Sequence, residues 1–279
     1  MEDTHTPPFN LERFGIGTHA YWSLNPTGKL LVLVHGFKGA AGTTWLGLLQ
    51  NLILQPQAAG CDIISFGYDS VRQTGGESAM ELQIFLDKLF VKTSQVINQS
   101  FDDYGSKMRR PENWKYSQIV IAAHSLGACV SRRALLNQIQ SGRNKWEVEI
   151  RLAWFAPAHR GAKIGALLCA VTNLIPSGLG KFIDVGAKYF SPALKDLEPG
   201  SEFLTELLDD TKKLCDEHLS LNAPITFWVL RDKVVTNGTF AKDVVPFEFV
   251  DGSDHVSICK LDDYDEQRIG GLLKIMSFT

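Results

Sequence analysis

The stretch Gln118-Ile-Val-Ile-Ala-Ala-His-Ser-Leu-Gly127 decides how the rest of the sequence is interpreted. Its first half is a continuous apolar run, which is typical of a strand buried on both faces of a sheet. Its second half holds Ser125, with the small residues Ala123 two positions before it and Gly127 two positions after it. Small residues at these positions permit the sharp strand-to-helix turn that lifts a nucleophilic hydroxyl clear of the backbone. The stretch therefore predicts a nucleophilic serine, with capping of the following helix as the alternative role.

Apolar runs and helical spacings alternate on both sides of this stretch. The apolar runs predict strands at Lys29–His35, Cys61–Tyr68, Gln118–Ala123, Val148–Phe155, Ile225–Leu230 and Val244–Val250. Helical periodicity predicts helices at about Trp45–Leu54, Glu77–Ile97, Ala128–Ile139 and Asp263–Met276. Strands that alternate with helices imply an α/β fold, with a mainly parallel central sheet flanked by helices.

The segment from Arg160 to Gly200 interrupts this alternation with about 40 residues. Apolar residues recur at spacings of three and four over 164–175, and the other side of that helix is also small and apolar. We therefore expect residues 160–200 to form a helical cap or lid, inserted before the penultimate strand of a single domain spanning residues 1–279. Extra core helices are the alternative. Phe182, Tyr189 and Phe190 in this segment are candidates for an apolar substrate-binding pocket.

A serine hydroxyl is a poor nucleophile at neutral pH and needs a general base that a third group orients. Where the serine follows a strand of an α/β sheet, the acid and then the histidine follow it along the chain. His159, His218 and His255 follow Ser125. His218 falls in a stretch of helical character, and His159 precedes every strong candidate for the acid. His255, in a polar loop after the last predicted strand, is therefore the predicted base.

The predicted acid is Asp232, which directly follows the apolar run ending at Leu230. A carboxylate at the end of a strand can accept a hydrogen bond from the imidazole, fix its tautomer and stabilise the imidazolium. Asp251 and Asp254 are worse candidates because they lie too near His255 in sequence to reach the far side of its ring.

The glycine-containing loop His35-Gly-Phe-Lys-Gly39 follows the first strong strand. Backbone N–H groups in such a loop can stabilise the oxyanion of an acyl-transfer reaction. We expect the N–H of Phe37 and that of Leu126 to be the two donors. The glycines do not match a phosphate-binding GxxxxGK[ST] loop.

Composition excludes several other classes of protein. The net charge of −3, from 28 basic and 31 acidic residues, argues against a nucleic-acid binder. The five cysteines form no CxxC pair and no HExxH motif occurs, so we expect neither a metal nor a cofactor. No apolar run is long enough to span a membrane, and the first residues do not resemble a secretory signal. We therefore expect a cytoplasmic protein without a transmembrane segment; the sequence does not indicate its oligomeric state.

The sequence resembles the α/β-hydrolase superfamily over about residues 28–276. The motifs that carry this resemblance, in the superfamily's order, are LVLVHGFKG, IAAHSLGA, LRDKVV and DGSDHVSI. Within the superfamily, the chain resembles the lipase-like serine esterases related to GPI inositol-deacylases. The features behind this closer resemblance are the HGFxG loop, the APAHRGA turn and the stretch LKDLEPGSEFLTEL.

The resemblance implies Ser125 as nucleophile, His255 as base and Asp232 as its orienting acid, with Phe37 and Leu126 as oxyanion donors. The chain departs from the superfamily pattern at Ala123, where the first elbow glycine is usual. The expected activity is hydrolysis of a carboxylic ester with an apolar part, through an acyl-enzyme. The alternatives are acyl transfer, thioester or amide cleavage by the same residues, and a non-catalytic binding or signalling module.

Overall fold

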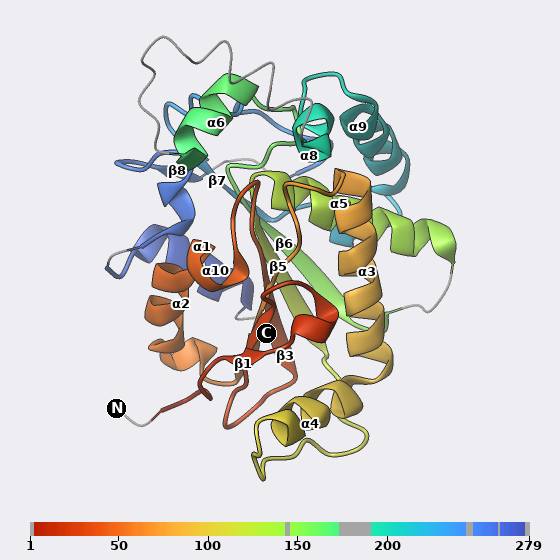
Figure 1. The fold of residues 1–279 in the computed structure, drawn as a ribbon, viewed down its shortest axis with the longest axis vertical. Helices are drawn as coiled ribbons and strands as arrows, with labels where there is room; N and C mark the ends of the chain where they lie inside the picture. Colours follow the sequence, from red (N-terminus) through yellow and green to blue (C-terminus); the bar gives the residue numbers. More distant parts are fainter. Residues whose placement is uncertain (1–2, 143–145, 173–190, 244–247, 262, 277–279) are drawn as a thin grey trace.

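The computed structural model describes residues 3–142, 146–172, 191–243, 248–261 and 263–276. The described strands form one sheet with helices on both faces (Figure 1). Along the chain, these strands are β1 (Phe9–Asn10), β2 (His19–Tyr21), β3 (Lys29–Val34), β4 (Cys61–Phe66), β5 (Gln118–His124), β6 (Glu149–Phe155), β7 (Ile225–Val229) and β8 (Glu248–Val250).

The spatial order of the strands is β1-β2-β4-β3-β5-β6-β7-β8. β1 and β2 are antiparallel to their neighbours, and every pair from β4 to β8 is parallel. In the centre of the sheet, Leu31 of β3 pairs with Ile63 of β4 on one side and with Val120 of β5 on the other. The predicted mainly parallel sheet is therefore confirmed.

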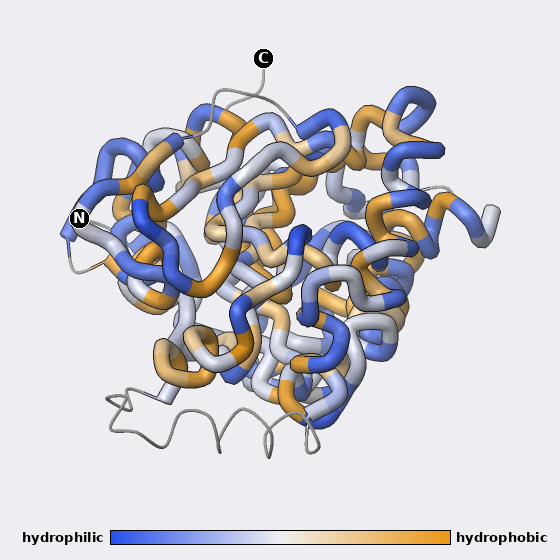
Figure 2. Tube along the Cα trace, turned by 90° about the horizontal axis from the view of Figure 1, so that it is seen from above, coloured by the Kyte–Doolittle hydropathy of each residue, from blue (hydrophilic) through white to orange (hydrophobic). Residues whose placement is uncertain are grey.

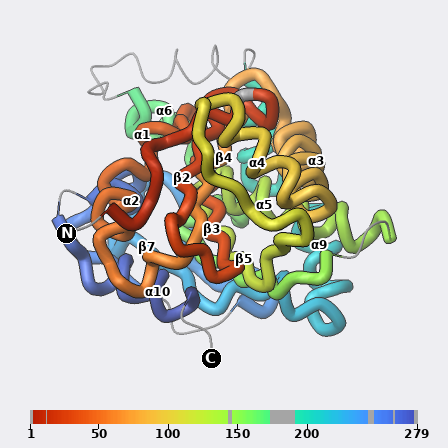
Figure 3. Tube along the Cα trace, turned by 90° about the horizontal axis from the view of Figure 1, so that it is seen from below, coloured from red at the N-terminus to blue at the C-terminus, as the bar shows by residue number. Residues whose placement is uncertain are grey.

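The helices cover the two faces of this sheet. Their bounds are α1 (Ala41–Thr44), α2 (Leu46–Ile53), α3 (Gly75–Val91), α4 (Thr93–Asp103), α5 (Leu126–Ser141), α6 (Ile164–Thr172), α8 (Pro192–Asp196), α9 (Glu202–Leu214) and α10 (Gly271–Met276). Shorter helical turns are η1 (Glu12–Phe14), η2 (Pro56–Ala58), η3 (Leu219–Leu221), η4 (Ser257–Cys259) and the π-helical η5 (Glu266–Gly270). Seen from below, α2 and α10 lie on one side of the strands and α3, α5 and α9 on the other (Figure 3).

Cover on both faces explains why the central strands are buried almost throughout and are mostly apolar. Every residue of β4 and β5 is buried, and so is every residue of β3 after Lys29. Hydrophobic segments accordingly occupy much of the centre of the molecule, with hydrophilic segments along much of its periphery (Figure 2). Burial of apolar surface, at roughly 25 cal/mol per Å², is the main force that holds the helices on the sheet.

One predicted helix, Glu77–Ile97, is two helices in the structure. α3 begins earlier, because the side chains of Thr74 and Glu77 form a reciprocal capping box at its start. The chain leaves the helical conformation at Lys92, with φ −131° and ψ 42°, and α4 then runs in a different direction (Figure 1). The predicted helix ends at Ile97, whereas α4 continues to Asp103.

The ends of other predicted elements also shift. The predicted final helix starts as the π-helical η5 before it becomes α10. β8 covers Glu248–Val250 of the last predicted strand, and residues 244–247 lie outside the described residues.

The predicted cap is described only in part. α6 and α8 fall within residues 160–200 and lie at the same end of the molecule (Figure 1). The candidate pocket residues Phe182, Tyr189 and Phe190 lie outside the described residues. The cap and the single-domain boundary therefore stay predictions.

Candidate active site

Ser125 occupies a one-residue turn between β5 and α5. Its φ of 52° and ψ of −119° lie outside the conformations that side-chain-bearing residues usually adopt. Such strain costs roughly 1–3 kcal/mol and persists where the surroundings enforce it. Here the N–H of Ser125 donates to the carbonyl of Phe155 at 3.0 Å, and its own carbonyl accepts from Ala158 at 3.2 Å. The side chain makes no capping hydrogen bond to α5, so the alternative role as a helix cap is wrong.

The packing of α5 requires the small residue Gly127, two positions after the serine. A Cβ on Gly127 would lie 2.4 Å from the carbonyl oxygen of His35 and 2.6 Å from that of Val34. Both obstacles are backbone atoms and cannot rotate away. The first turn of α5 therefore lies directly on the end of β3, which brings Ser125 beside the loop that follows β3.

The structure brings the three predicted side chains into one hydrogen-bonded chain, which we call the Ser–His–Asp chain. His255 Nε2 lies 3.0 Å from Ser125 Oγ, and His255 Nδ1 lies 2.9 Å from Asp232 Oδ2. A carboxylate only accepts hydrogen bonds, so the imidazole proton is on Nδ1. Nε2 is then free to accept the hydroxyl proton of the serine.

Asp232 is held in its ionised form. Its side chain is fully buried, and burial by itself raises the pKa of a carboxyl. This effect is outweighed by the hydrogen bond and charge of His255 and by the backbone N–H groups of Val234 and Val235, at 2.7 and 3.0 Å. The pKa of Asp232 is therefore lowered, which makes it a carboxylate at neutral pH.

The competing acids beside the histidine hold the shape of its loop. Asp254 Oδ1 accepts the backbone N–H groups of Val256 and Ser257 at 2.9 and 2.7 Å. Asp251 accepts from the N–H of Gly252. The carboxylate that contacts the ring of His255 is that of Asp232, as predicted from sequence.

His159 belongs to a different buried network. Its ring packs against Phe240 and Trp154, with centroids 4.4 and 5.4 Å away, and its Nε2 accepts from Arg132 Nε at 3.4 Å. Arg132 also forms an ion pair with Asp243, in which its Nη2 donates to both carboxylate oxygens, at 2.6 and 2.7 Å. Burial, aided by the charge of Arg132, lowers the pKa of His159 well below its ordinary value. These contacts give His159 a role in packing. His218, the third candidate, lies in the turn after α9.

The loop after β3 passes close to Ser125. A Cβ on Gly36 would lie 2.9 Å from the Cβ of Ser125, so only glycine lets the backbone approach this closely. The two predicted donors, Phe37 and Leu126, follow Gly36 and Ser125 in the chain. Among the described residues, neither backbone N–H has a hydrogen-bond partner. Their role as oxyanion donors stays a prediction.

Two aromatic rings hold this loop in place. His35 Nδ1 donates to the carbonyl of Gly36 at 2.9 Å, and the hydroxyl of Tyr68 donates to the carbonyl of His35 at 2.8 Å. The two rings also stack, with centroids 4.4 Å apart. Burial lowers the pKa of His35 to about 4, so the ring is neutral at physiological pH.

The described residues hold neither a cluster of metal ligands nor a membrane-spanning helix. No three His, Cys, Asp or Glu side chains gather there as metal ligands. None of the helices in the described part of the chain is both long enough and apolar enough to cross a bilayer.

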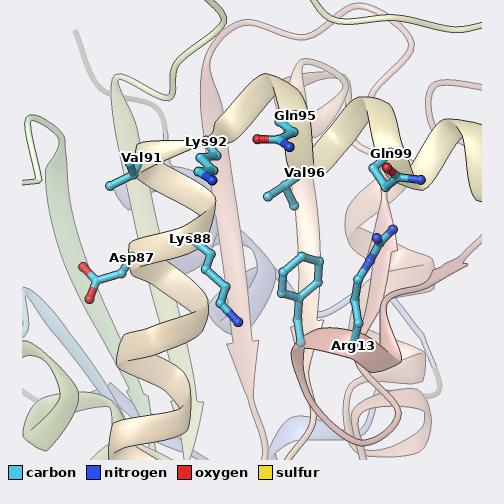
Figure 4. Close-up of a pocket in the computed structure, with 9 residues that line it drawn as sticks. Arg13, Asp87, Lys88, Val91, Lys92, Gln95, Val96 and Gln99 are labelled. Atoms are coloured by element: carbon cyan, nitrogen blue, oxygen red, sulfur yellow. The ribbon is translucent and has the colours of Figure 1, made fainter.

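A separate groove of about 410 Å³ lies where η1 meets the junction of α3 and α4 (Figure 4). Arg13, Phe14 and Lys88 are among the side chains that line it. Its acid, Asp87, accepts from the indole of Trp146 at 2.7 Å. The groove contains no member of the Ser–His–Asp chain. It lies beside α4, at the opposite end of the molecule from α6, which falls in the predicted cap (Figure 1).

Comparison with known proteins identifies the fold. No family model and no curated protein matches the sequence. Among solved structures, the mature lipase BlEst2 of Bacillus licheniformis is 16% identical, with a TM-score of 0.56 over 94% of this chain and 98% of that chain. The peroxisomal alpha-beta-hydrolase Lpx1 of Saccharomyces cerevisiae is 12% identical, with a TM-score of 0.54 over 93% and 81% of the two chains. The esterase Pf2001 of Pyrococcus furiosus is 16% identical, with a TM-score of 0.51 over 94% and 86%.

These likenesses confirm the fold expected from the sequence motifs. The protein has the α/β-hydrolase fold. Its closer resemblance to the GPI inositol-deacylase-like esterases stays a prediction.

Proposed function

We propose that the protein is a serine hydrolase that cleaves carboxylic esters. The observation that carries this proposal is the position of His255, whose ring lies within hydrogen-bond distance of both Ser125 Oγ and Asp232 Oδ2. Nucleophile, base and orienting acid in this arrangement are the parts that activate a serine. The similar structures named as a lipase and an esterase support an ester as the substrate.

In the proposed reaction, Ser125 Oγ attacks the ester carbonyl carbon while its proton passes to His255 Nε2. The N–H groups of Phe37 and Leu126 stabilise the negative charge on the carbonyl oxygen. The C–O bond to the alcohol then breaks, and the departing alkoxide takes the proton from His255. A water molecule attacks the acyl-enzyme with the same base, and the carboxylic acid leaves with Ser125 restored. Asp232 stabilises the imidazolium in both halves.

The substrate we propose has an apolar acyl or alcohol part. Residues 160–200 form a cap in this proposal, and Phe182, Tyr189 and Phe190 shape its pocket. The half-buried side of α6, which carries the small apolar residues Ala166, Cys169 and Ala170, supports an apolar surface there. Residues 1–279 act as one domain, and the location we propose is the cytoplasm.

The test compares Ser125→Ala with Ser131→Ala, which removes another buried serine hydroxyl, from α5. We expect Ser125→Ala to lose fluorophosphonate labelling and to lower kcat on p-nitrophenyl esters by roughly 10⁵–10⁶-fold. Ser131→Ala should keep both. Labelling or turnover that survives in Ser125→Ala would contradict the proposal.

Esters of rising acyl length, beside thioesters and amides of the same acyl group, define the substrate. We expect esters to be the best substrates and longer chains to be favoured over acetate. A flat dependence on chain length would contradict the apolar pocket, and faster thioester or amide cleavage would contradict ester specificity.

A further inference from the structure

His124, the residue directly before the serine, contacts the histidine of the Ser–His–Asp chain. Its Nε2 lies 2.7 Å from the backbone carbonyl oxygen of His255, although 131 positions separate the two residues in sequence. The two rings lie with centroids 5.1 Å apart. His124 is the last residue of β5, so this hydrogen bond ties the central sheet directly to the loop that carries His255.

The hydrogen-bond partner of His124 determines which of its two ring nitrogens carries the proton. A carbonyl oxygen can only accept, so Nε2 carries the hydrogen and donates it. Burial, and next the charge of His255, lower the pKa of His124 to about 3; Asp232 and His35 are the other titratable groups that act on it. The ring therefore stays neutral, and it adds no positive charge beside His255 when that residue is protonated.

The other hydrogen bonds near His255 hold its loop rather than its own carbonyl. The side chain of Asp254 accepts the N–H groups of Val256 and Ser257, within the loop. Arg268 donates from η5 to the carbonyl groups of Ser257 and Ile258, beyond the histidine. Among the described residues, the backbone of His255 therefore has one side-chain donor from the central sheet, His124.

We propose that His124 is a positioning residue for the base: its Nε2–H holds the carbonyl of His255, and so keeps the imidazole between Ser125 Oγ and Asp232 Oδ2. This inference rests on the proposed function for its effect on rate. The hold of His124 on the position of the His255 ring does not depend on that function, because the hydrogen bond exists in the resting protein. Without it, the ring of His255 samples other orientations, and less of the enzyme is ready to take the serine proton.

The test uses two substitutions at this position. His124→Leu removes the donor, whereas His124→Gln keeps an N–H donor at the same distance along the side chain as in histidine. We expect His124→Leu to lower kcat about tenfold, the equivalent of one ordinary hydrogen bond, with KM little changed. His124→Gln should recover most of that loss. Loss of equal size in both variants, or wild-type kcat in His124→Leu, would overturn the proposal.

His5 supplies a matched control. It is also a buried histidine whose Nε2 donates to a backbone carbonyl, that of Cys61 at 2.8 Å, but it is not part of the Ser–His–Asp chain. His5→Leu should lower Tm and leave kcat unchanged. The ratio of the loss in kcat to the loss in Tm is compared between the two variants. If this ratio is the same in His5→Leu and His124→Leu, the effect of His124 is on stability alone and the proposal fails.

Nitrogen NMR shifts of the histidine rings give a readout that needs no turnover. In the wild-type protein we expect the proton of His124 on Nε2 and that of His255 on Nδ1. In His124→Leu, His255 should become a mixture of tautomers, and His124→Gln should restore the single one. An unchanged His255 in His124→Leu would overturn the positioning role. A wild-type protein with these shifts and no hydrolysis would instead contradict the proposed function alone.

Discussion

At the scale of single residues, Asp232 shows how a buried carboxyl stays ionised. Removal from water favours the neutral acid, but three N–H donors converge on this side chain, from His255, Val234 and Val235. Hydrogen bonds that favour the charged form lower a carboxyl pKa, and here their effect, with that of the charge of His255, is larger than the rise caused by burial. The same donors fix the direction from which the carboxylate meets the imidazole.

This balance predicts a pH dependence of stability. Because folding lowers the pKa of Asp232, its ionisation stabilises the native state at pH values above its pKa in the unfolded chain, about 4. That contribution is lost as the pH falls through the lower folded value. We expect the difference in unfolding free energy between wild type and Asp232→Asn, measured with urea, to shrink as the pH falls from about 6 to about 3. A difference that stays constant over this range would contradict the assignment.

The same substitution should also lower kcat at neutral pH, by roughly 10⁴-fold. The amide that Asp232→Asn introduces can donate to Nδ1 and so favours the wrong tautomer of His255. Ester hydrolysis measures the loss, and a variant that keeps wild-type kcat would contradict the role of Asp232 as the orienting acid.

At the scale of elements, the junction of β5 with α5 depends on the closeness of α5 to β3. Gly127→Ala places a methyl group within 2.4 Å of a backbone oxygen, so the helix or the strand must shift. We expect a loss of about 1–3 kcal/mol of stability and a lower kcat, because Ser125 lies two residues away. Urea unfolding and ester hydrolysis measure the two effects.

Gly76, in the first turn of α3, is the control for this prediction. A Cβ there meets only Thr74 Oγ1, at 3.9 Å, and its φ is helical. Gly76→Ala should therefore leave kcat unchanged and raise stability, by up to about 1 kcal/mol. Equal effects of the two substitutions would show that the close contact at Gly127 has no consequence.

The break between α3 and α4 shows the limit of helical periodicity. Apolar residues continue at helical spacing across Lys92, so the pattern predicts one helix. Phe101 of α4 packs against the rings of Phe9 and Trp22. Phe85 of α3 packs instead against the rings of Phe14 and Phe66. Packing of each helix on its own surface therefore outweighs continuation of the helix.

At the scale of the whole molecule, the Ser–His–Asp chain draws on distant parts of the sequence. Ser125 follows β5 in the centre of the sheet, whereas Asp232 and His255 follow β7 and β8 at its edge. The site therefore exists only while the central strands and the edge strands hold together.

This arrangement predicts one cooperative unfolding transition. Tryptophans are spread through the fold, with Trp22 after β2 and Trp228 in β7. Fluorescence therefore reports on the sheet near both of its edges. We expect fluorescence, circular dichroism and ester hydrolysis to be lost at the same urea concentration. Loss of hydrolysis at a lower concentration than the other two would contradict a single unfolding unit.

The sequence by itself determined the six strands β3 to β8 of the sheet, and it predicted the three residues of the Ser–His–Asp chain. Apolar strands alternate with helices, and Ser125, Asp232 and His255 each follow a strand. Both features are local patterns, so they can be recognised in the sequence without knowledge of packing. The helix break at Lys92 and the hydrogen bond from His124 to His255 were decided by the tertiary structure alone. Each depends on which surfaces meet in three dimensions, and residues 131 positions apart carry no local signal that they touch.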